Sequence, residues 1–566
     1  MPVCRNRVAS VSRLFEASAL PWAWDALAVA FVLGFAFPAQ AQLAGGGLTD
    51  SGIIGANGSL RDAVTSLLTP PSVNLGRPWT FNGAIDVEAG ATDSPGGDNQ
   101  GWQPLLIFAP DFNLNGVTSR LNVSLSYSPR LAYYPESSSQ TLLSNTFNGD
   151  ATATVFPDWL FLNVRGVTGL TSRFGGTSLQ SNTFYTNSDA VQTSSFSVSP
   201  YVQHTFGGWG TLTVSYVYSA TFQDANSGLP YFAPNAAATA GFGTTGNLQT
   251  NSEAGSFTTG ENFGRVQDTI SASASQNSGS PFYNGSSTLF ANNQISYALY
   301  RWLTLIGNVG YEEYNYPASN YRLSDPTWAV GVTVIPNTDS SITVEYGRKA
   351  GTNTILSNFT YSPTARTRLY GGYNVDIQTG AGARQGLLAS TTVGPGGILV
   401  DRVTGNPVLS NAHLASQFSL SRIKTLTVGG VLLFDRDTFS AILGRTEIQQ
   451  LVNSTDVFGI ATPANTSTTS TFGTLSWQHD FNPSNSLYTS FSYGTDSTGA
   501  YFGFPGSSQD TIQLYSGLRH TFTDSLTGSL SFSHSERFGG AITTLPAAFG
   551  GTATQNTVLV GLRKSF

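Results

Sequence analysis

Few residues in this chain of 566 have the types and spacing that metal binding or catalysis requires. It has five histidines, and none stands at the short spacing from a second ligand that zinc sites use. The single cysteine, Cys4, lies in a segment that we expect to be removed from the mature protein. We therefore expect no metal and no cofactor, and we interpret the histidines as polar residues of strands and loops. They are His204, His413, His479, His520 and His534.

Hydroxyl nucleophiles and phosphate-binding loops are also weakly indicated. Ser531, Ser533 and His534 share one predicted strand, but nothing marks a nucleophile or an orienting partner, and a catalytic triad is recognised by geometry rather than by spacing. The glycine-rich segments 45–47 and 394–397 lack the Lys-Ser/Thr ending of a phosphate-binding loop. We expect the chain not to be an enzyme.

The charged residues are scarce, and many lie on one face of the predicted strands. They make up 10% of the chain, against about 25% in soluble globular domains. Between Arg366 and Ile377, the charges fall on one set of alternating residues, and the other set is uncharged. In a membrane barrel the charged set must face the lumen, because an arginine at the bilayer midplane costs about 2–4 kcal/mol. The pore-lining candidates are Glu345, Arg348, Arg366, Arg368, Tyr370, Asp376, Arg519 and Arg563.

Two interpretations of these charges stay open. Rings of fixed charge tune the selectivity of a pore. Alternatively, the charges pair with one another and make the barrel wall rigid. Tyr370 could in addition stack on a sugar ring.

The elements that would position these residues are β-strands. From Trp79 onward, apolar and polar residues alternate with period 2, as in Gly210–Phe222, where Leu212 and Val214 alternate with Thr213 and Ser215. We predict an all-β fold, a closed antiparallel transmembrane β-barrel, and keep a secreted β-solenoid or β-sandwich as the alternative. The net charge of −7 argues against nucleic-acid binding, which requires a basic face.

The connections alternate between short turns and long loops, which predicts about 20 strands, with 18 to 22 as the range. The longest loops are 225–261, 379–417 and 451–468. We place the short turns on the periplasmic side. The nine predicted turns are Asn113–Gly116, Pro157-Asp158, Gly207–Gly210, Tyr300–Trp302, Asn337–Ser340, Ser362–Ala365, Asp435–Asp437, Asn482–Asn485 and Thr523–Ser525.

Aromatic residues gather at the strand ends in two bands, which is typical of the two interfaces of a membrane. The band near the short turns comprises Trp159, Phe206, Trp209, Tyr300, Trp302, Trp477, Phe481, Phe522 and Phe566. The band near the long loops comprises Tyr133, Tyr134, Tyr314, Tyr316, Tyr346 and Tyr493.

The two ends of the chain carry processing signals. Basic residues, an apolar run and the sequence Ala39-Gln40-Ala41 predict a signal peptide over residues 1–41. Residues 42–78 would then be a periplasmic N-terminal arm, and residues 79–566 the barrel. The last strand ends on Phe566, and such a terminal aromatic resembles the signal that the barrel-assembly machinery recognises in outer-membrane proteins.

Four segments carry a family resemblance. They are Trp302–Tyr316 (WLTLIGNVGYEEYNY), Pro326–Val334 (PTWAVGVTV), Thr338–Gly347 (TDSSITVEYG) and Ser357–Ser362 (SNFTYS). They resemble a family of outer-membrane β-barrel porins that accompany bacterial exopolysaccharide and PEP-CTERM sorting systems. The resemblance covers residues 260–450 and implies an outer-membrane location and a link to the export of envelope polysaccharide. It implies no catalytic residue.

Together these features predict a bacterial outer-membrane channel for the passive passage of polar solutes or of a secreted glycan. Its expected partners are outer-membrane lipid, the assembly machinery and, through the resemblance, envelope polysaccharide, with no nucleic acid. The segment 379–417, with Arg384, Asp401 and Arg402, is predicted to fold into the lumen and narrow it. The main alternative is a surface protein whose long extracellular loops bind a partner, with the barrel only an anchor.

Overall fold

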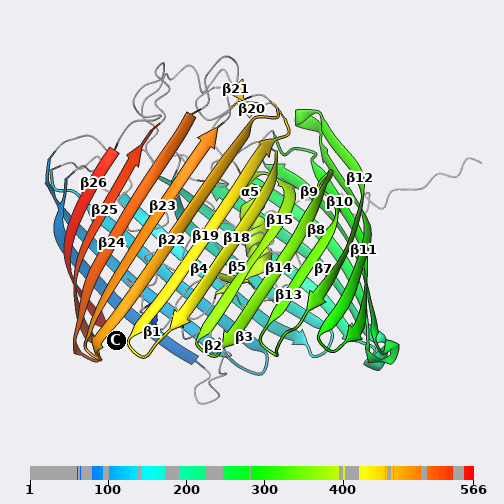
Figure 1. Cartoon of the computed structure of the whole chain (residues 1–566), viewed down its shortest axis with the longest axis horizontal. Helices are drawn as coiled ribbons and strands as arrows, with labels where there is room; N and C mark the ends of the chain where they lie inside the picture. The colour runs from blue at the N-terminus through cyan, green and yellow to red at the C-terminus, as the bar shows by residue number, and fades with distance from the viewer. Residues whose placement is uncertain are drawn as a thin grey trace, which may run out of the picture.

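The alternation from Trp79 onward produces one closed sheet. In the computed structural model, 22 antiparallel strands pair in the order of the chain, and the last strand, β26, pairs with the first, β1 (Figure 1). The structure describes residues 60–61, 64, 79–93, 101–136, 142–172, 190–223, 247–279, 282–393, 399–401, 420–452, 454–455, 461–462, 464–498, 507–539 and 553–566.

Strands of nine to 17 residues form the wall. Their bounds are β1 Trp79–Thr92, β2 Gln103–Val117, β3 Leu121–Tyr133, β4 Leu142–Phe156, β5 Leu160–Ser172, β6 Ala190–Thr205, β7 Gly210–Gln223, β8 Leu248–Thr259, β9 Val266–Gly279, β10 Ser287–Tyr300, β11 Leu303–Tyr316, β12 Tyr321–Val334, β13 Ser341–Lys349, β14 Thr352–Thr364, β15 Thr367–Gln378, β18 Ser421–Leu433, β19 Asp437–Gln450, β22 Ser467–Asn482, β23 Asn485–Thr498, β24 Ser507–Thr523, β25 Leu526–Phe538 and β26 Ala553–Ser565.

Short elements lie between some of these strands. The helix α5 (Gly380–Ser390) follows β15, and two small hairpins pair β16 (Thr391–Val393) with β17 (Leu399–Asp401) and β20 (Ser454–Thr455) with β21 (Ala461–Thr462). Among the described residues, single-turn 3₁₀ helices occur at η3 (Gly207–Trp209), η4 (Glu261–Phe263) and η5 (Pro317–Ser319). No helix of the described ranges is both long enough and apolar enough to cross a bilayer.

The outer surface of the sheet is apolar. Val309, Leu443 and Val560 are 68%, 64% and 59% exposed, although each lies within a strand. A barrel that exposes such residues all round its outside, and turns the alternate residues inward, is stable only in a bilayer. The chain is therefore an all-β transmembrane barrel of the bacterial outer membrane.

The barrel has 22 strands rather than about 20, because one hairpin was not predicted. β8 lies entirely within the predicted loop 225–261. The turn at η4, which leads into β9, begins at the last residue of that loop. The sequence of β8, LQTNSEAGSFTT, is rich in Ser, Thr, Asn and Gly and shows no apolar alternation. A second correction concerns Asn113–Gly116, which belongs to β2, since that strand continues to Val117.

The aromatic bands are confirmed at one end of the barrel and wrong in part at the other. Near the short turns, Trp209, Phe522 and Phe566 are 65%, 56% and 68% exposed. Near the long loops, Tyr133, Tyr346 and Tyr493 are exposed, but three tyrosines of the predicted band are buried. Those three are Tyr134, Tyr314 and Tyr316. They belong to the inward-facing set, because successive side chains of a strand point to opposite faces and the residues directly next to these tyrosines belong to the outward-facing set.

The C-terminus closes the barrel at the short-turn end. The Phe566 amide donates a hydrogen bond to the carbonyl oxygen of Gly83 at 2.9 Å. A Cβ at Gly83 would approach the Phe566 ring to 3.2 Å, so the ring lies directly over the glycine. Lys564, beside it on the outer face, donates through Nζ to Ser525 Oγ at 2.7 Å.

Candidate functional site

The site that can decide passage through this barrel is its lumen, and most of the predicted pore-lining residues face it. On β15, Leu369 is exposed on the outer surface, whereas Arg368, Tyr370 and Asp376 belong to the alternate set. Glu345 lies between the outward residues Val344 and Tyr346. Arg519 and Arg563 follow the same rule, since their neighbours Leu518 and Leu562 are exposed outward.

Two candidates lie elsewhere. Arg348 belongs to the outward set of β13, since it follows Tyr346 by two residues and lies opposite the exposed Trp328 of β12. Arg366 is not part of a strand. It sits in the turn between β14 and β15, at the periplasmic end, and its Nη1 pairs with Asp435 Oδ1 at 3.0 Å. Asp435 belongs to the turn between β18 and β19. Both side chains are largely exposed, at 63% and 87%. The pair therefore links two neighbouring turns at the rim of the barrel.

The fixed charges around β26, β1, β2 and β3 are held in the wall. Arg563 donates through Nη2 to Asp111 Oδ2 at 2.9 Å, and the two side chains are only 11% and 4% exposed. Asp111 also accepts from Ser128 Oγ at 2.8 Å. In the register, Arg563 lies opposite Asp86, with Glu88 two residues further along β1. This arrangement favours the second interpretation of the charges, in which they pair and make the wall rigid.

A second network of polar contacts lies at the extracellular end of β11–β15. Arg348 makes a bidentate salt bridge to Asp325, with Nε–Oδ2 at 2.8 Å and Nη2–Oδ1 at 2.9 Å. Lys349 donates to Asn374 Oδ1 at 3.2 Å and lies 4.0 Å from Asp376. Such paired contacts fix side chains more firmly than single exposed ion pairs.

The hairpin that joins β13 to β14 is the centre of this network. Its turn uses Ala350 and Gly351, both at positive φ (53° and 71°), a conformation that costs alanine more than glycine. The Gly351 amide donates to Glu312 Oε1 at 3.2 Å, and Arg422 Nε donates to the Ala350 carbonyl at 2.9 Å. The hairpin tip is thus bonded to β11 on one side and to β18 on the other.

A buried cluster of apolar and tyrosine side chains lies beside the hairpin tip. It collects residues from β8 to the end of β19, together with the connection between β9 and β10. Tyr314 donates to Asp376 Oδ1 at 3.4 Å, which joins the cluster to the polar network. Burial raises the pKa of the Tyr283 phenol, in the β9–β10 connection, to about 12. The members are Leu248, Tyr283, Tyr314, Tyr316, Ala350, Val375, Ile377, Ala381, Leu420 and Val452.

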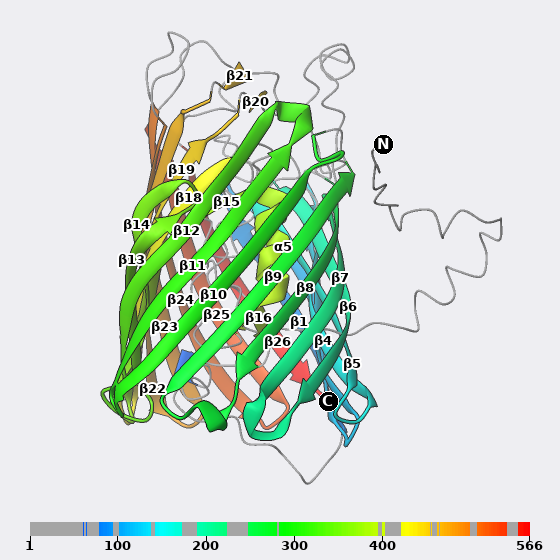
Figure 2. The same ribbon diagram turned by 90° about the vertical axis from the view of Figure 1, so that its right-hand side faces the viewer.

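The helix α5 lies inside the barrel, as the two perpendicular views show (Figures 1 and 2). Thr379 starts it, since its Oγ1 accepts from the Gly382 amide at 3.1 Å and its carbonyl accepts from the Ala383 amide at 2.8 Å. On one side, Gln385 donates to the Leu248 carbonyl at 3.1 Å and accepts from Thr250 Oγ1 at 2.7 Å. Both partners belong to β8.

The other side of α5 packs against a distant part of the wall. Ala383 forms a small buried cluster with Ile423 of β18 and Ile448 of β19. The strands β9–β15 separate β8 from β18 along the shorter path around the barrel. A single helix therefore contacts two separate stretches of the wall and crosses the space between them.

Of the three predicted constriction-loop residues, the structure describes the backbone of two. Arg384 lies within α5, and Asp401 ends β17, where its backbone pairs with Thr391. The side chains of these two residues and the whole of Arg402 lie outside the described residues. Sequence reasoning did not identify Glu312, Asp325 or Tyr283 as members of the site. The period-2 pattern of β11 did place Glu312, Tyr314 and Tyr316 on one face, and that was the signal available.

The periplasmic end of the lumen holds a further contact that the sequence analysis did not predict. Arg61, in the segment predicted as a periplasmic arm, donates through Nη1 to Asp480 Oδ2 at 3.1 Å and through Nη2 to the Phe434 carbonyl at 3.0 Å. Its amide donates to Gln478 Oε1 at 3.2 Å. Leu60 and Val64, one helical turn apart, are fully buried. The described part of this segment is therefore docked on β22 and on the turn between β18 and β19.

Replacing Arg61 by alanine should release this docked segment. The variant loses hydrogen bonds to a charged partner, which are worth about 1.5–3 kcal/mol each. We expect cleavage of the N-terminal segment by a protease added to the periplasmic side to become about tenfold faster. Arg61→Lys is the matched control, because it keeps the charge beside Asp480, and its cleavage rate should lie in between. Equal rates in the wild type and in Arg61→Ala would show that these contacts do not hold the segment.

Comparison with known proteins identifies no family for this chain. No family model matches it, and no curated protein matches its sequence. Among solved structures, a mutant of the ferric enterobactin receptor PfeA of Pseudomonas aeruginosa, in complex with enterobactin, is 12% identical, with a TM-score of 0.44 over 86% of this chain and 81% of that chain. The siderophore receptor PirA of Acinetobacter baumannii is 10% identical, with a TM-score of 0.41 over 88% and 81%. The Vibrio cholerae outer-membrane protein OmpT, with loop L8 deleted, is 8% identical, with a TM-score of 0.28 over 86% and 99%.

Proposed function

We propose that this chain is a passive outer-membrane channel for polar solutes, with a lumen narrowed by α5. The contacts of this helix with β8 and with β18–β19 carry the proposal, since an open barrel of this size would have an aqueous or plugged interior. A helix that reaches both stretches of wall divides that interior. The buried tyrosine cluster and the polar network beside it would narrow the extracellular end of the lumen.

The inner wall supports the choice of solute. Fixed charges such as Arg563 and Asp111 neutralise each other within it. On β22 and β23, inward hydroxyls bond across the strands, with Thr474 Oγ1 and Ser492 Oγ 3.0 Å apart. A surface of hydroxyl groups and tyrosines suits polyhydroxylated molecules, which exchange hydrogen bonds with hydroxyls and stack on rings. Passage of a secreted glycan, suggested by the family resemblance, is the narrower form of this proposal.

Swelling of liposomes that contain the purified barrel tests the channel directly. We expect swelling in isotonic solutions of small neutral sugars, and rates that fall steeply as the sugar grows, because α5 limits the free cross-section. A charged solute of similar size, such as gluconate, should permeate without strong selection by sign, since the wall charges are paired.

The same measurement separates the channel from its main alternative. A surface protein that uses its barrel only as an anchor would give no swelling with any sugar, although it would still insert into the liposomes. Correct insertion is checked by the shift in gel mobility that folded barrels show before and after boiling. Folded protein without swelling would contradict the proposal and favour a binding role for the long loops.

A further inference from the structure

A region of the outer wall across β8 to β10 carries polar side chains where a surface in contact with lipid is expected to be apolar. Glu253 of β8 lies opposite Tyr216 of β7 and opposite Ala274 of β9, and Ala274 lies opposite Leu289 of β10. Tyr216 and Leu289 are 42% and 41% exposed, so this row faces outward. The carboxylate of Glu253 therefore projects from the outside of the barrel.

Other polar side chains share this outer patch. Asn251 and Gln276 lie opposite each other and are both exposed. They form the next outward-facing pair after Glu253 and Ala274, toward the start of β8. Asn293 of β10 lies between the outward residues Ile270 and Val309. We call the region formed by Tyr216, Asn251, Glu253, Gln276, Asn293 and the small residues between them the outer patch.

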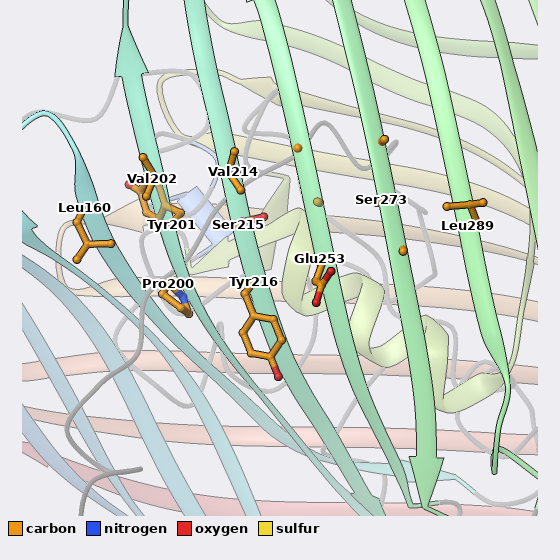
Figure 3. A pocket seen from close by; sticks show the side chains of 14 residues that line it. Leu160, Pro200, Tyr201, Val202, Val214, Ser215, Tyr216, Glu253, Ser273 and Leu289 are labelled. Carbon is orange, nitrogen blue, oxygen red and sulfur yellow. The ribbon is translucent and has the colours of Figure 1, made fainter. Parts of the chain in front are cut away.

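The outer patch is hollowed. A groove with a volume of about 540 Å³ runs across β5 to β10, and Figure 3 shows Tyr216, Glu253 and Leu289 along it. Small residues form its floor, because Gly255, Ala272 and Ala274 stand where the rest of the wall carries larger side chains. A Cβ at Gly255 would meet only the Thr213 carbonyl, at 4.0 Å.

The depth of Glu253 makes its exposure to lipid costly. It lies four residues from Phe257 toward the extracellular side, on the same outward set, in the middle of β8. On the neighbouring β7, outward apolar residues continue six positions past its partner Tyr216, to Phe222. A carboxylate within this apolar belt is unfavourable unless it is paired. Within the described part of the chain, no hydrogen bond or ion pair holds the Glu253 carboxylate.

We propose that the outer patch is the contact between two copies of this chain, related by a two-fold axis through the groove. The patch is complementary to itself, because it holds a carboxylate acceptor and the amide donors that the carboxylate needs. Asn251 already accepts from the Tyr216 hydroxyl at 2.6 Å through Oδ1, which leaves its N–H groups to donate to the partner's Glu253. A two-fold contact uses the same patch on both copies, and it is the commonest symmetry of oligomers.

The small residues fit the same conclusion. Lipid gives no hydrophobic drive for association, so membrane interfaces depend on close packing over small residues and on hydrogen bonds across the contact. Here Gly255, Ala272 and Ala274 provide the hollow, and Tyr216 and Leu289 provide the side chains that fill the hollow of the other copy. The contact lies on the outer wall, so it does not depend on the proposed channel function.

Cross-linking of single-cysteine variants in native outer membranes tests the two-fold contact. In a Cys4→Ser background, a cysteine at Ala272 or at Ala274 should give a covalent dimer with a short bis-maleimide reagent. Leu443→Cys is the matched control, since Leu443 is 64% exposed on β19, far around the barrel, and it should give at least about tenfold less dimer. Only a symmetric contact joins two copies through the same single position.

Charge at position 253 gives a second, independent readout. Glu253→Lys should lower the yield of the Ala274→Cys dimer about tenfold, because it removes the acceptor and places like charges near each other, whereas Glu253→Gln should have a smaller effect. The proposal is overturned if neither alanine position cross-links, or if the Leu443→Cys control cross-links equally. It is also overturned if dimers form only in mixtures of Ala274→Cys and Leu443→Cys, or if the cross-linked product contains a different protein.

Discussion

Deletion of residues 381–410 is expected to raise the single-channel conductance in planar bilayers about threefold or more, since a barrel of this width without its internal helix leaves a wide aqueous path. The deletion removes Ala383, which packs on Ile423 and Ile448, and Gln385, which bonds to β8. It leaves all 22 strands of the wall in place. The purified variant and the wild type are compared at the same salt concentration and voltage.

A second long connection of the chain provides the control. Shortening the connection between β7 and β8, over residues 228–244, should change the conductance little. The gel-mobility shift on boiling shows that both variants fold. If the deletion of 381–410 yields folded barrels with unchanged conductance, α5 does not obstruct the path and the proposed narrowing is wrong. If conductance rises in both variants equally, the extracellular loops rather than α5 limit the current.

Arg563→Ala is expected to destabilise the barrel by about 3–5 kcal/mol, the usual loss when one partner of a buried ion pair is removed. The variant leaves Asp111, only 4% exposed, without its guanidinium partner in the wall. Arg563 also lies on β26, which closes the barrel against β1, so the seam itself is weakened. The free energy of unfolding is measured by urea titration in detergent or lipid, with the fraction of folded barrel read from gel mobility.

Arg366→Ala is the matched control for this measurement. Arg366 also makes an ion pair, with Asp435 at 3.0 Å, but both side chains are largely exposed at the rim. Exposed pairs contribute about 0–1 kcal/mol, so this variant should unfold almost as the wild type does. The double variant Arg563→Ala with Asp111→Asn should recover part of the stability, since it removes the buried charge that Arg563 compensates. Equal losses in Arg366→Ala and Arg563→Ala would show that burial of the pair does not set its contribution.

The polar outward face of β8 explains why the number of strands could not be predicted correctly from the sequence. Strands are recognised by an apolar outward set, and β8 presents Asn251, Glu253 and Gly255 on that side. A pattern method sees such a segment as a loop. If the outer patch meets a second copy, the polar outward residues that hid β8 are the same residues that the contact requires.

The buried tyrosines show a second property that the sequence pattern leaves undecided. The period-2 pattern assigns Tyr314 and Tyr316 to one face of β11, but it does not say which of two aromatic-rich faces meets lipid. The partners settle this, because Tyr314 donates a hydrogen bond to Asp376 and shares one buried cluster with Leu248 and Val375. Those partners are brought together by the closing of the sheet, which joins residues that are distant in the chain.

The sequence by itself determined that this chain forms a membrane-spanning barrel, and it assigned Arg368, Tyr370 and Asp376 to the inner face, because the alternation of side chains is a local property of an extended strand. Only the tertiary structure decided which charges pair, where α5 lies and that Glu253 faces outward, with no partner among the residues that the structure describes. Pairing depends on strand register and on contacts between distant segments, and both are fixed only when the whole sheet closes.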